Sequence, residues 1–477
     1  MNGKRAARAK WLLLAFLALS GVVMSPVGEG FPGWVAAGLL VGALVIGIGA
    51  ATLQPTDMLG VLALSVPVQD LGAVHAFETT FTLTKFCVTS IAIGWTIRLA
   101  AGKRVSIDSV AWAYVGVTVA LAVSIVARSD GPAWAGETYR WAIAGFVFVV
   151  ARSEMTERRH VHRVLLGIAA GVIGVSFLAI RQVALTDGPP SFVVNGVLRA
   201  YGTFGQPNPL AAYLELSLPI LIAVTIIPLA LRQSPTSPPV LLIPAMVAIG
   251  VGAIGLGLTQ SRGGWLGFAA AELVLLGGFP PRARAVVAGG AAVALAGMLG
   301  SGMGTALTDR LASLSDVGSS RVHVTPENWS NQERRAHWGA AMNMFRAFPW
   351  TGVGAGGFDD AYREYTSDWR FRVTRGHAHN GYLQMAAQAG VAGLIGFACW
   401  VGTIALKTGK RARGSADVSG DARALGGFAT IVACAAHSMV DYVNVLSIGI
   451  HLALVIAVSL ADLPASSELM IEGPNRR

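Results

Sequence analysis

Three short polar clusters interrupt a mostly apolar sequence, and each contains side chains that could bind or activate a charged substrate. The first runs from Arg199 to Pro209, and its arginine could bind an anion. Asn208 is expected to cap the helix that follows, with Pro209 in the first helical position. The alternative is a capped loop whose arginine simply extends to the membrane interface.

The second cluster is Ser261-Arg262-Gly263, which we expect in a tight turn between two apolar helices. Ser261 is placed to cap the second helix, whose free N–H groups and positive dipole end attract an anion. With the Arg262 guanidinium beside them, these groups would suit a phosphate. An interfacial arginine without a ligand accounts for the local sequence equally well.

The third cluster is His377-Ala378-His379-Asn380, just before a helix expected over 382–406. A His-x-His pair could ligate a metal, but the sequence offers no third ligand at a useful spacing, so we expect no metal. A histidine that is neutral near pH 7 could instead act as a general base. The simplest alternative is an interfacial histidine that only makes hydrogen bonds.

Apolar helices must position these clusters. Hydrophobic residues make up 53% of the 477 and charged residues only 13%, whereas a soluble domain carries about 25% charged residues. A bilayer-spanning helix needs about 20 apolar residues, so the expected fold is an all-α, polytopic membrane bundle of about 12–14 transmembrane helices with one large periplasmic loop. The expected helices cover roughly 12–26, 34–52, 57–73, 79–99, 107–127, 137–152, 161–181, 208–230, 239–259, 262–279, 284–303, 382–406, 421–441 and 445–462.

The net charge of +10 indicates membrane topology rather than nucleic-acid binding. The basic residues lie in short clusters between apolar runs, as expected for loops that stay in the cytoplasm. This distribution predicts that the N-terminus, the loop over 407–423 and the C-terminus are cytoplasmic, so that the three polar clusters face the other side. The three cysteines lie in apolar segments and form no disulfide or zinc framework.

This topology divides the chain into four segments. They are transmembrane helices over 1–303, a large periplasmic loop over 304–381, further transmembrane helices over 382–463 and a cytoplasmic tail over 464–477. In the loop, apolar residues recur at helical spacing and predict an amphipathic helix. They are Trp338, Ala341, Met342 and Phe345. That helix either packs on the rest of the loop or lies along the membrane surface.

Together, the clusters resemble the O-antigen ligase and O-antigen polymerase superfamily of bacterial membrane proteins, most clearly over 195–450. The matching residues are Arg199 with Gly202-Thr203-Phe204 and Asn208, Ser261-Arg262-Gly263, Trp338, the turn from Gly352 to Phe358, His377-Ala378-His379-Asn380, and His437-Ser438 with Asp441. Nine residues separate Asn380 from Gly390-Val391-Ala392-Gly393, a spacing similar to the ligase signature. Gln388 stands where that pattern has an acidic residue, so no role of a carboxylate is expected there.

The resemblance implies a GT-C-type membrane glycosyltransferase of the bacterial inner membrane, with a glycan donor on undecaprenyl pyrophosphate and no metal or other cofactor. We expect His379 to be the base, because it stands beside Asn380 at the family spacing, and we expect it to begin the helix. His377 lies two residues farther out in the loop. Arg199 and Arg262 would hold the leaving pyrophosphate by forked hydrogen bonds. The candidates for substrate binding besides these arginines are Tyr201, Asn208, Arg335, His377, Asn380 and Asp441.

The sequence does not identify the acceptor, so several hypotheses about the function stay open. The leading one is an O-antigen ligase that passes the glycan to lipid A–core. A polymerase of O-antigen or exopolysaccharide repeat units would use the same chemistry, and relatives glycosylate proteins. A transporter of lipid-linked glycans or small solutes is a hypothesis of another class, because Lys85, Glu215, Glu272 and Asp441 lie within or near apolar spans. The one-sided loop and the absence of an internal repeat argue against transport.

Overall fold

The computed structural model describes residues 33–69, 74–76, 79–127, 131–194, 196–230, 239–298, 329–414 and 418–463, and three residues before them, Leu12, Ala15 and Phe16. Most of the expected helix over 12–26 lies outside the described residues. The same holds for the first part of the large loop expected over 304–381, up to 328, and for the tail over 464–477.

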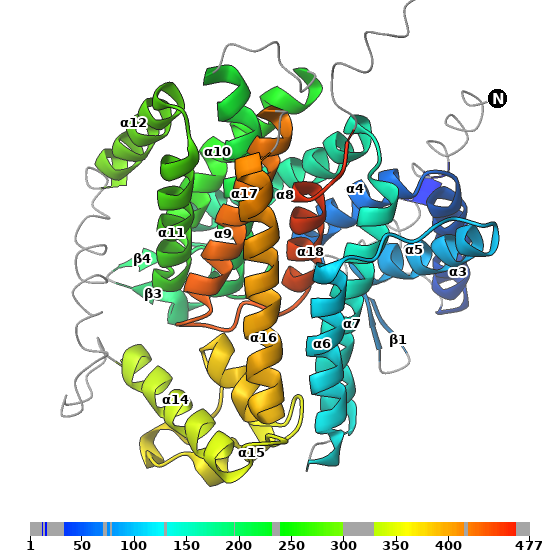
Figure 1. Cartoon of the computed structure of the whole chain (residues 1–477). Helices are drawn as coiled ribbons and strands as arrows, with labels where there is room; N and C mark the ends of the chain where they lie inside the picture. Colours follow the sequence, from blue (N-terminus) through cyan, green and yellow to red (C-terminus); the bar gives the residue numbers. More distant parts are fainter. Residues whose placement is uncertain are drawn as a thin grey trace, which may run out of the picture.

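Helices form almost all of the described chain (Figure 1). They are α3 (Gly33–Leu53), α4 (Pro55–Ser65), α5 (Leu83–Ala100), α6 (Ser109–Val123), α7 (Gly131–Glu154), α8 (Arg158–Leu185), α9 (Pro207–Ala230), α10 (Pro239–Leu258), α11 (Arg262–Gly278), α12 (Pro281–Met298), α14 (Trp329–Ala347), α15 (Phe358–Tyr365), α16 (Gly381–Gly414), α17 (Val418–His437) and α18 (Ile448–Ser459). Short 3-10 turns lie at Val66–Val68, Ser124–Val126, Pro190–Phe192 and Trp369–Phe371.

The helices confirm an all-α membrane bundle that crosses the membrane several times. Among the described residues, six helices are long and apolar enough to span a bilayer. Four shorter apolar helical stretches accompany them, over Val41–Leu53, Pro55–Val68, Ala422–His437 and Ile448–Ser459. Apolar residues exposed on the outside of the bundle, such as Trp112 and Ile243, are those that lipid would cover.

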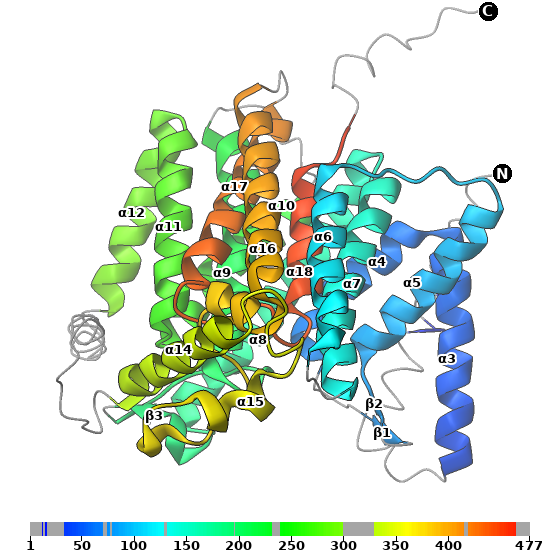
Figure 2. The ribbon, with the colours of Figure 1, turned by 60° about the horizontal axis from the view of Figure 1, so that its bottom comes forward.

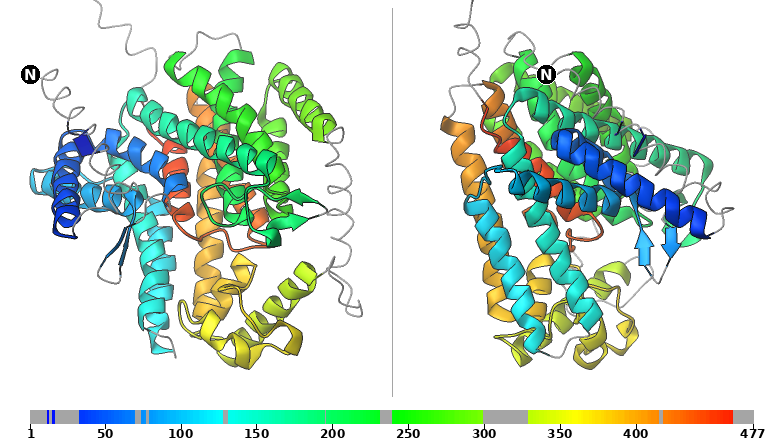
Figure 3. Two further views of the ribbon diagram at one scale, coloured as in Figure 1. Left: turned by 180° about the vertical axis from the view of Figure 1, so that it is seen from behind. Right: turned by 90° about the vertical axis from the view of Figure 1, so that its right-hand side faces the viewer.

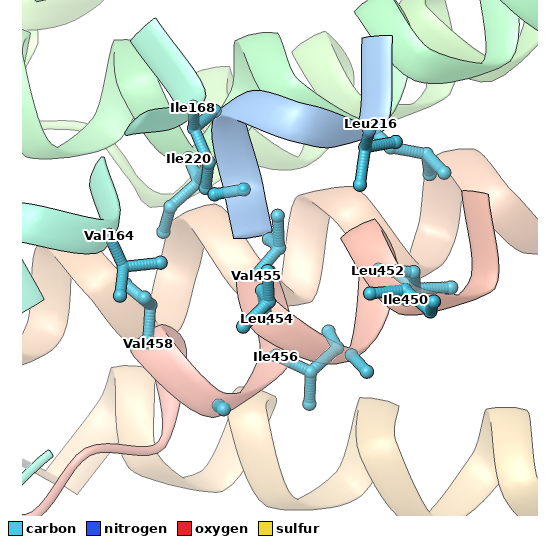
Figure 4. Packing of buried hydrophobic residues seen from close by; sticks show 14 of the residues in the cluster. Val164, Ile168, Leu216, Ile220, Ile450, Leu452, Leu454, Val455, Ile456 and Val458 are labelled. Carbon is cyan, nitrogen blue, oxygen red and sulfur yellow. The ribbon is translucent and has the colours of Figure 1, made fainter. Parts of the chain in front are cut away.

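Helix α9 is the centre of the bundle. It is apolar on all sides, and 94% of its most apolar 18-residue stretch is buried. This is expected for a helix surrounded by other helices. It packs against α10, α11, α17 and α18. Figure 3 shows the whole bundle from two further sides. Figure 4 shows part of this core, where residues of α18 meet Leu216 and Ile220 of α9 and Ile168 of α8. This central position lets α9 hold polar groups away from lipid.

The chain forms two short hairpins, and the first replaces helix ends that the sequence predicted. The helix expected over 57–73 ends at Val68, and the helix expected from 79 begins only at Leu83. Between them, β1 (Val74–Ala76) pairs with β2 (Thr79–Phe81). Strand β3 (Val193–Val194) pairs with β4 (Val197–Leu198) in the same antiparallel manner. Threonine, valine and phenylalanine favour strands, and this local preference overrides the apolar continuity on which the helix prediction rested.

The amphipathic helix of the loop forms as α14 and packs on the rest of the loop rather than standing alone. Its buried residues Ala340, Ala341 and Met344 form a small core with Phe358 and Tyr362 of α15. Figure 2 shows α14 and α15 together at one end of the bundle. The buried face is shifted by one residue from the predicted face. His337, and not Trp338, stacks on the Tyr362 ring, with 4.6 Å between the ring centroids.

The glycine-rich turn after α14 attaches this layer to α16. Its backbone N–H groups at Val353 and Gly354 donate to the carbonyls of Ala387 and Gln388, at 2.8 and 3.1 Å. A Cβ on Gly352 would lie 2.3 Å from the Gln388 backbone, so only glycine permits the contact. Helix α16 breaks at the same place, where Gly390 has φ +60°. The turn therefore positions the segment that carries the two histidines.

Candidate active site

The His379 imidazole is paired with the Asp441 carboxylate. Nδ1 of His379 lies 3.0 Å from Oδ1 of Asp441, although 62 positions separate the two residues. The His379 side chain is 14% exposed and that of Asp441 is 6% exposed. A histidine held by a carboxylate on Nδ1 presents Nε2 to the other side, which is the arrangement of a general base and its orienting acid.

His379 does not begin the helix, as the sequence predicted, but precedes it in a strained conformation. Helix α16 begins at Gly381, and Asn380 accepts the N–H of Leu383 at 3.0 Å as a cap does. His379 has φ 50°, a left-handed value that costs roughly 1–3 kcal/mol for a residue other than glycine. The Trp338 indole donates to the His379 carbonyl at 2.9 Å and helps to hold that conformation.

Asp441 comes from the loop over 438–447 between α17 and α18, where the sequence predicted the ends of two helices. Its Oδ1 also accepts the backbone N–H of Tyr442 at 2.9 Å. The Asn208 amide donates to Oδ2 at 2.7 Å, and the Arg334 guanidinium lies 4.0 Å from it. Burial alone would raise the pKa of this carboxyl, but the two neighbouring histidines and Arg334 hold it well below its usual range.

His377 lies beside the pair, in the segment that precedes α16. Its Nδ1 accepts the backbone N–H of His379 at 3.2 Å and lies 3.7 Å from Oδ1 of Asp441. Burial and, to a lesser degree, the His379 imidazole lower the pKa of His377 to about 3. The His377 ring is therefore neutral at physiological pH and packs against His379 at 4.4 Å between centroids.

A chain of hydrogen bonds connects Arg199 to this pair. The Arg199 guanidinium donates to the Thr259 carbonyl at 2.9 Å and to Oδ1 of Asn208 at 3.0 Å. Asn208 then donates to Asp441. The prediction that Asn208 caps α9 is wrong, because the helix already begins at Pro207 and the amide is engaged by two side chains instead.

The Ser261 cap is confirmed. The Ser261 side chain accepts the N–H of Gly264, and Arg262 is the first residue of α11. The turn before it lies against the first cluster, because the N–H of Ala200 donates to the Leu258 carbonyl at 2.9 Å. Arg199 and the start of α11 are thus brought together by the fold.

An open cavity of about 330 Å³ lies in front of the His379–Asp441 pair. It is lined by Phe204, Gly205, Gln206, Asn208, Pro209, Ala212, Arg375, His377, His379, His437, Asp441, Tyr442, Val443, Val445 and Leu446. Of the candidates from the sequence, Asn208, His377, His379 and Asp441 therefore reach the cavity. Arg199 and Arg262 are not among the lining residues. A cavity of this size and polarity suits a sugar or phosphate group.

Three further candidates lie outside the cavity lining. The Tyr201 ring contacts Phe192 at 5.4 Å between centroids, and its hydroxyl donates to the Asp187 carbonyl. Arg335 lies on α14, but the guanidinium nearest Asp441 is that of its neighbour Arg334. The Asn380 side chain donates to the Met439 carbonyl at 2.7 Å, which ties the start of α16 to the loop over 438–447.

Sequence reasoning missed Arg334, Arg375 and the pair formed by Glu215 and His437. Arg334 and Arg335 are neighbours on α14, but spacing alone does not say which arginine lies near the site. Glu215 stood out only as a charge inside an apolar span. His437 appeared only among the residues of the resemblance. Their partners lie far away in the sequence, so no local pattern pointed to their roles.

The fold also supplies the third metal ligand that was absent from local spacing. Ligand atoms of His377, His379 and Asp441 all lie within 4.8 Å of one another. Two imidazoles and one carboxylate are a donor set that zinc accepts. The geometry thus permits either a metal or a base held by a carboxylate, and a chelation experiment distinguishes them.

Comparison with known proteins identifies the class. Residues 245–398 match the family model described as O-antigen ligase, which confirms the resemblance to the O-antigen ligase superfamily. The protein is therefore a multi-pass membrane protein in which one segment is similar to the O-antigen ligase family. The match includes Arg262, His377 and His379, whereas Arg199 and Asp441 lie outside it. No curated protein sequence matches the chain.

Proposed function

We propose that this protein is a glycosyltransferase of the bacterial inner membrane that transfers a glycan from undecaprenyl pyrophosphate to an acceptor hydroxyl at the periplasmic face. The observation that carries the proposal is the His379–Asp441 pair at the wall of a polar cavity. The family match supports glycosyl transfer of the O-antigen ligase and polymerase type, and we propose lipid A–core as the acceptor. A repeat-unit polymerase would use the same cavity and differ in its acceptor.

In the proposed reaction, the acceptor oxygen attacks the anomeric carbon of the donor sugar. The bond from that carbon to the pyrophosphate oxygen breaks, and the electron pair leaves with undecaprenyl pyrophosphate. His379 takes the proton of the acceptor hydroxyl on Nε2, because Asp441 holds Nδ1. Arg262 stabilises the charge that develops on the leaving group, and Arg199 holds Asn208 and, through it, Asp441. A single displacement inverts the configuration of the anomeric carbon.

Purified protein with a lipid-linked donor and lipid A–core tests this function. We expect release of undecaprenyl pyrophosphate and extension of the acceptor in equal amounts. Replacing lipid A–core by a second molecule of donor identifies a polymerase if products lengthen. Movement of the donor across a vesicle membrane without release of undecaprenyl pyrophosphate would show a transporter and contradict the proposal.

The same assay decides between a base and a metal at the two histidines. We expect treatment with EDTA to leave the rate within about twofold of the untreated enzyme, because His379 needs only Asp441 to be oriented. Loss of transfer on chelation and its recovery with zinc would show that His377, His379 and Asp441 hold a metal.

The proposed orientation has its own test. Arg372 and Lys410 are exposed and lie on the two proposed sides of the membrane. In a variant without Cys87, Cys399 and Cys434, we expect Arg372→Cys to react with an impermeant maleimide from the periplasm and Lys410→Cys to stay unlabelled. The reverse pattern would place the cavity in the cytoplasm, away from the proposed donor.

A further inference from the structure

A second carboxylate–histidine pair lies at the wall of the same cavity. Nδ1 of His437, at the end of α17, lies 2.7 Å from Oε1 of Glu215 in α9. The side chains are 2% and 0% exposed, respectively. An isolated carboxylate inside a membrane bundle is costly, so a polar pair at this depth indicates a function. His437 lines the cavity, and its backbone carbonyl accepts the N–H of Asp441 at 3.0 Å.

Helix α11 is shaped to receive this pair. A Cβ on Gly263 would lie 2.5 Å from Nε2 of His437, and a Cβ on Gly267 would lie 2.5 Å from Oε2 of Glu215. The two glycines are four residues apart and so lie on one face of the helix. Larger side chains at either position would displace the imidazole or the carboxylate. The imidazole therefore meets the first turn of α11, where Arg262 is the first helical residue.

The second ring nitrogen of His437, which faces away from Glu215, has no hydrogen-bond partner among the described residues. Nε2 is buried and makes no hydrogen bond there, although buried polar atoms are nearly always paired. A carboxylate on Nδ1 favours the imidazolium form, in which Nε2 also carries a proton to donate. This donor lies against a helix N-terminus, whose N–H groups and dipole attract anions. The missing partner is therefore expected to be an anionic oxygen.

We propose that His437, held by Glu215, forms with the first turn of α11 the subsite for a phosphate group of the lipid-linked donor. The inference rests on the proposed function. His379 and His437 line one cavity, so a sugar between them would have the base on one side and the leaving phosphate on the other. The two carboxylate–histidine pairs thus have separate tasks. Asp441 orients a base, and Glu215 supports an anion-binding donor.

Another buried histidine that contacts α9 provides the matched control. His451 in α18 has its Nε2 2.8 Å from the Ser217 hydroxyl of α9 and is 0% exposed. It is buried like His437 but does not line the cavity. His451→Gln removes an equally buried imidazole without touching the proposed subsite. Its effect measures the cost of disturbing the packing around α9.

The test is inhibition of glycan transfer by inorganic pyrophosphate, together with the KM values for donor and acceptor. We expect His437→Gln to raise both the inhibition constant of pyrophosphate and the donor KM about tenfold, the value of one charge-assisted hydrogen bond. The acceptor KM and the His451→Gln variant should stay within about twofold of wild type. Glu215→Gln should weaken pyrophosphate inhibition in the same direction, because it removes the support of the imidazolium.

Direct binding keeps the inference separate from the proposed reaction. Pyrophosphate should raise the Tm of the wild-type protein, and less so that of His437→Gln, whether or not glycan is transferred. If transfer proceeds but His437→Gln changes neither pyrophosphate inhibition nor the donor KM, the subsite is refuted while the glycosyltransferase stands. An increase confined to the acceptor KM, or an equal effect of His451→Gln, would also overturn it. If His437→Gln does not fold, Gly263→Ala displaces the same imidazole and is expected to weaken pyrophosphate inhibition.

Discussion

His379→Ala is expected to lower the rate of glycan transfer about 10²–10⁴-fold, the usual contribution of a general base. The donor should still bind, because Arg262 and the other donor contacts remain. Asp441→Asn should lower the rate of transfer by a factor of the same order. An amide at that position can donate to Nδ1 of His379, which leaves the proton on the wrong nitrogen for a base. The measurement is kcat with saturating donor and acceptor, with donor binding measured separately.

His377→Ala is the matched comparison, since His377 lies beside the same carboxylate. Its neutral ring accepts the His379 N–H and only packs on the base. We expect transfer to fall no more than about tenfold, since one hydrogen bond to the His379 backbone is lost. If His377→Ala were the more damaging substitution, His377 would be the base and the role of His379 would be wrong. The family match would be unaffected by that result.

Arg262→Ala and Arg199→Ala should each lower transfer by about 10² or more, but through different kinetic constants. Two opposite charges about 4 Å apart gain about 4 kcal/mol at an effective dielectric near 20, and each 1.36 kcal/mol changes a rate tenfold. Arg262 is proposed to contact the donor phosphate, so its loss should raise the donor KM as well as lower kcat. Arg262→Lys should rescue poorly, because lysine lacks the planar fork.

Arg199 is expected to act mainly through Asn208 and Asp441, the two steps that separate it from His379. Arg199→Ala should therefore lower kcat more than it changes the donor KM. Arg199→Lys should also restore little activity, since an ammonium cannot donate to the Thr259 carbonyl and to Asn208 with the same geometry. Arg199→Ala combined with Asn208→Ala should be no slower than the worse single variant, because both break one chain of contacts. Additive losses would show that Arg199 contacts the donor directly.

Local patterns in the sequence determined the class of fold and the places where polar groups gather. Apolar stretches of bilayer length required helices, because each buried backbone group must be paired inside its own segment. Ser261 capped a helix as predicted, and the glycine-rich turn after the amphipathic helix formed as expected. These features depend on residues within one or two turns of each other. These features can therefore be predicted from the sequence alone.

Only the tertiary structure decided which side chains meet. Asp441 and His379 are 62 positions apart, and Glu215 and His437 are 222 positions apart. Their contacts depend on how α9, α11, α16 and α17 pack, and no local spacing encodes that packing. The same cause explains the errors. Asn208 had the right residue type for a cap, but the fold placed Asp441 and Arg199 within reach of its amide, and two charged partners outweigh one helix cap.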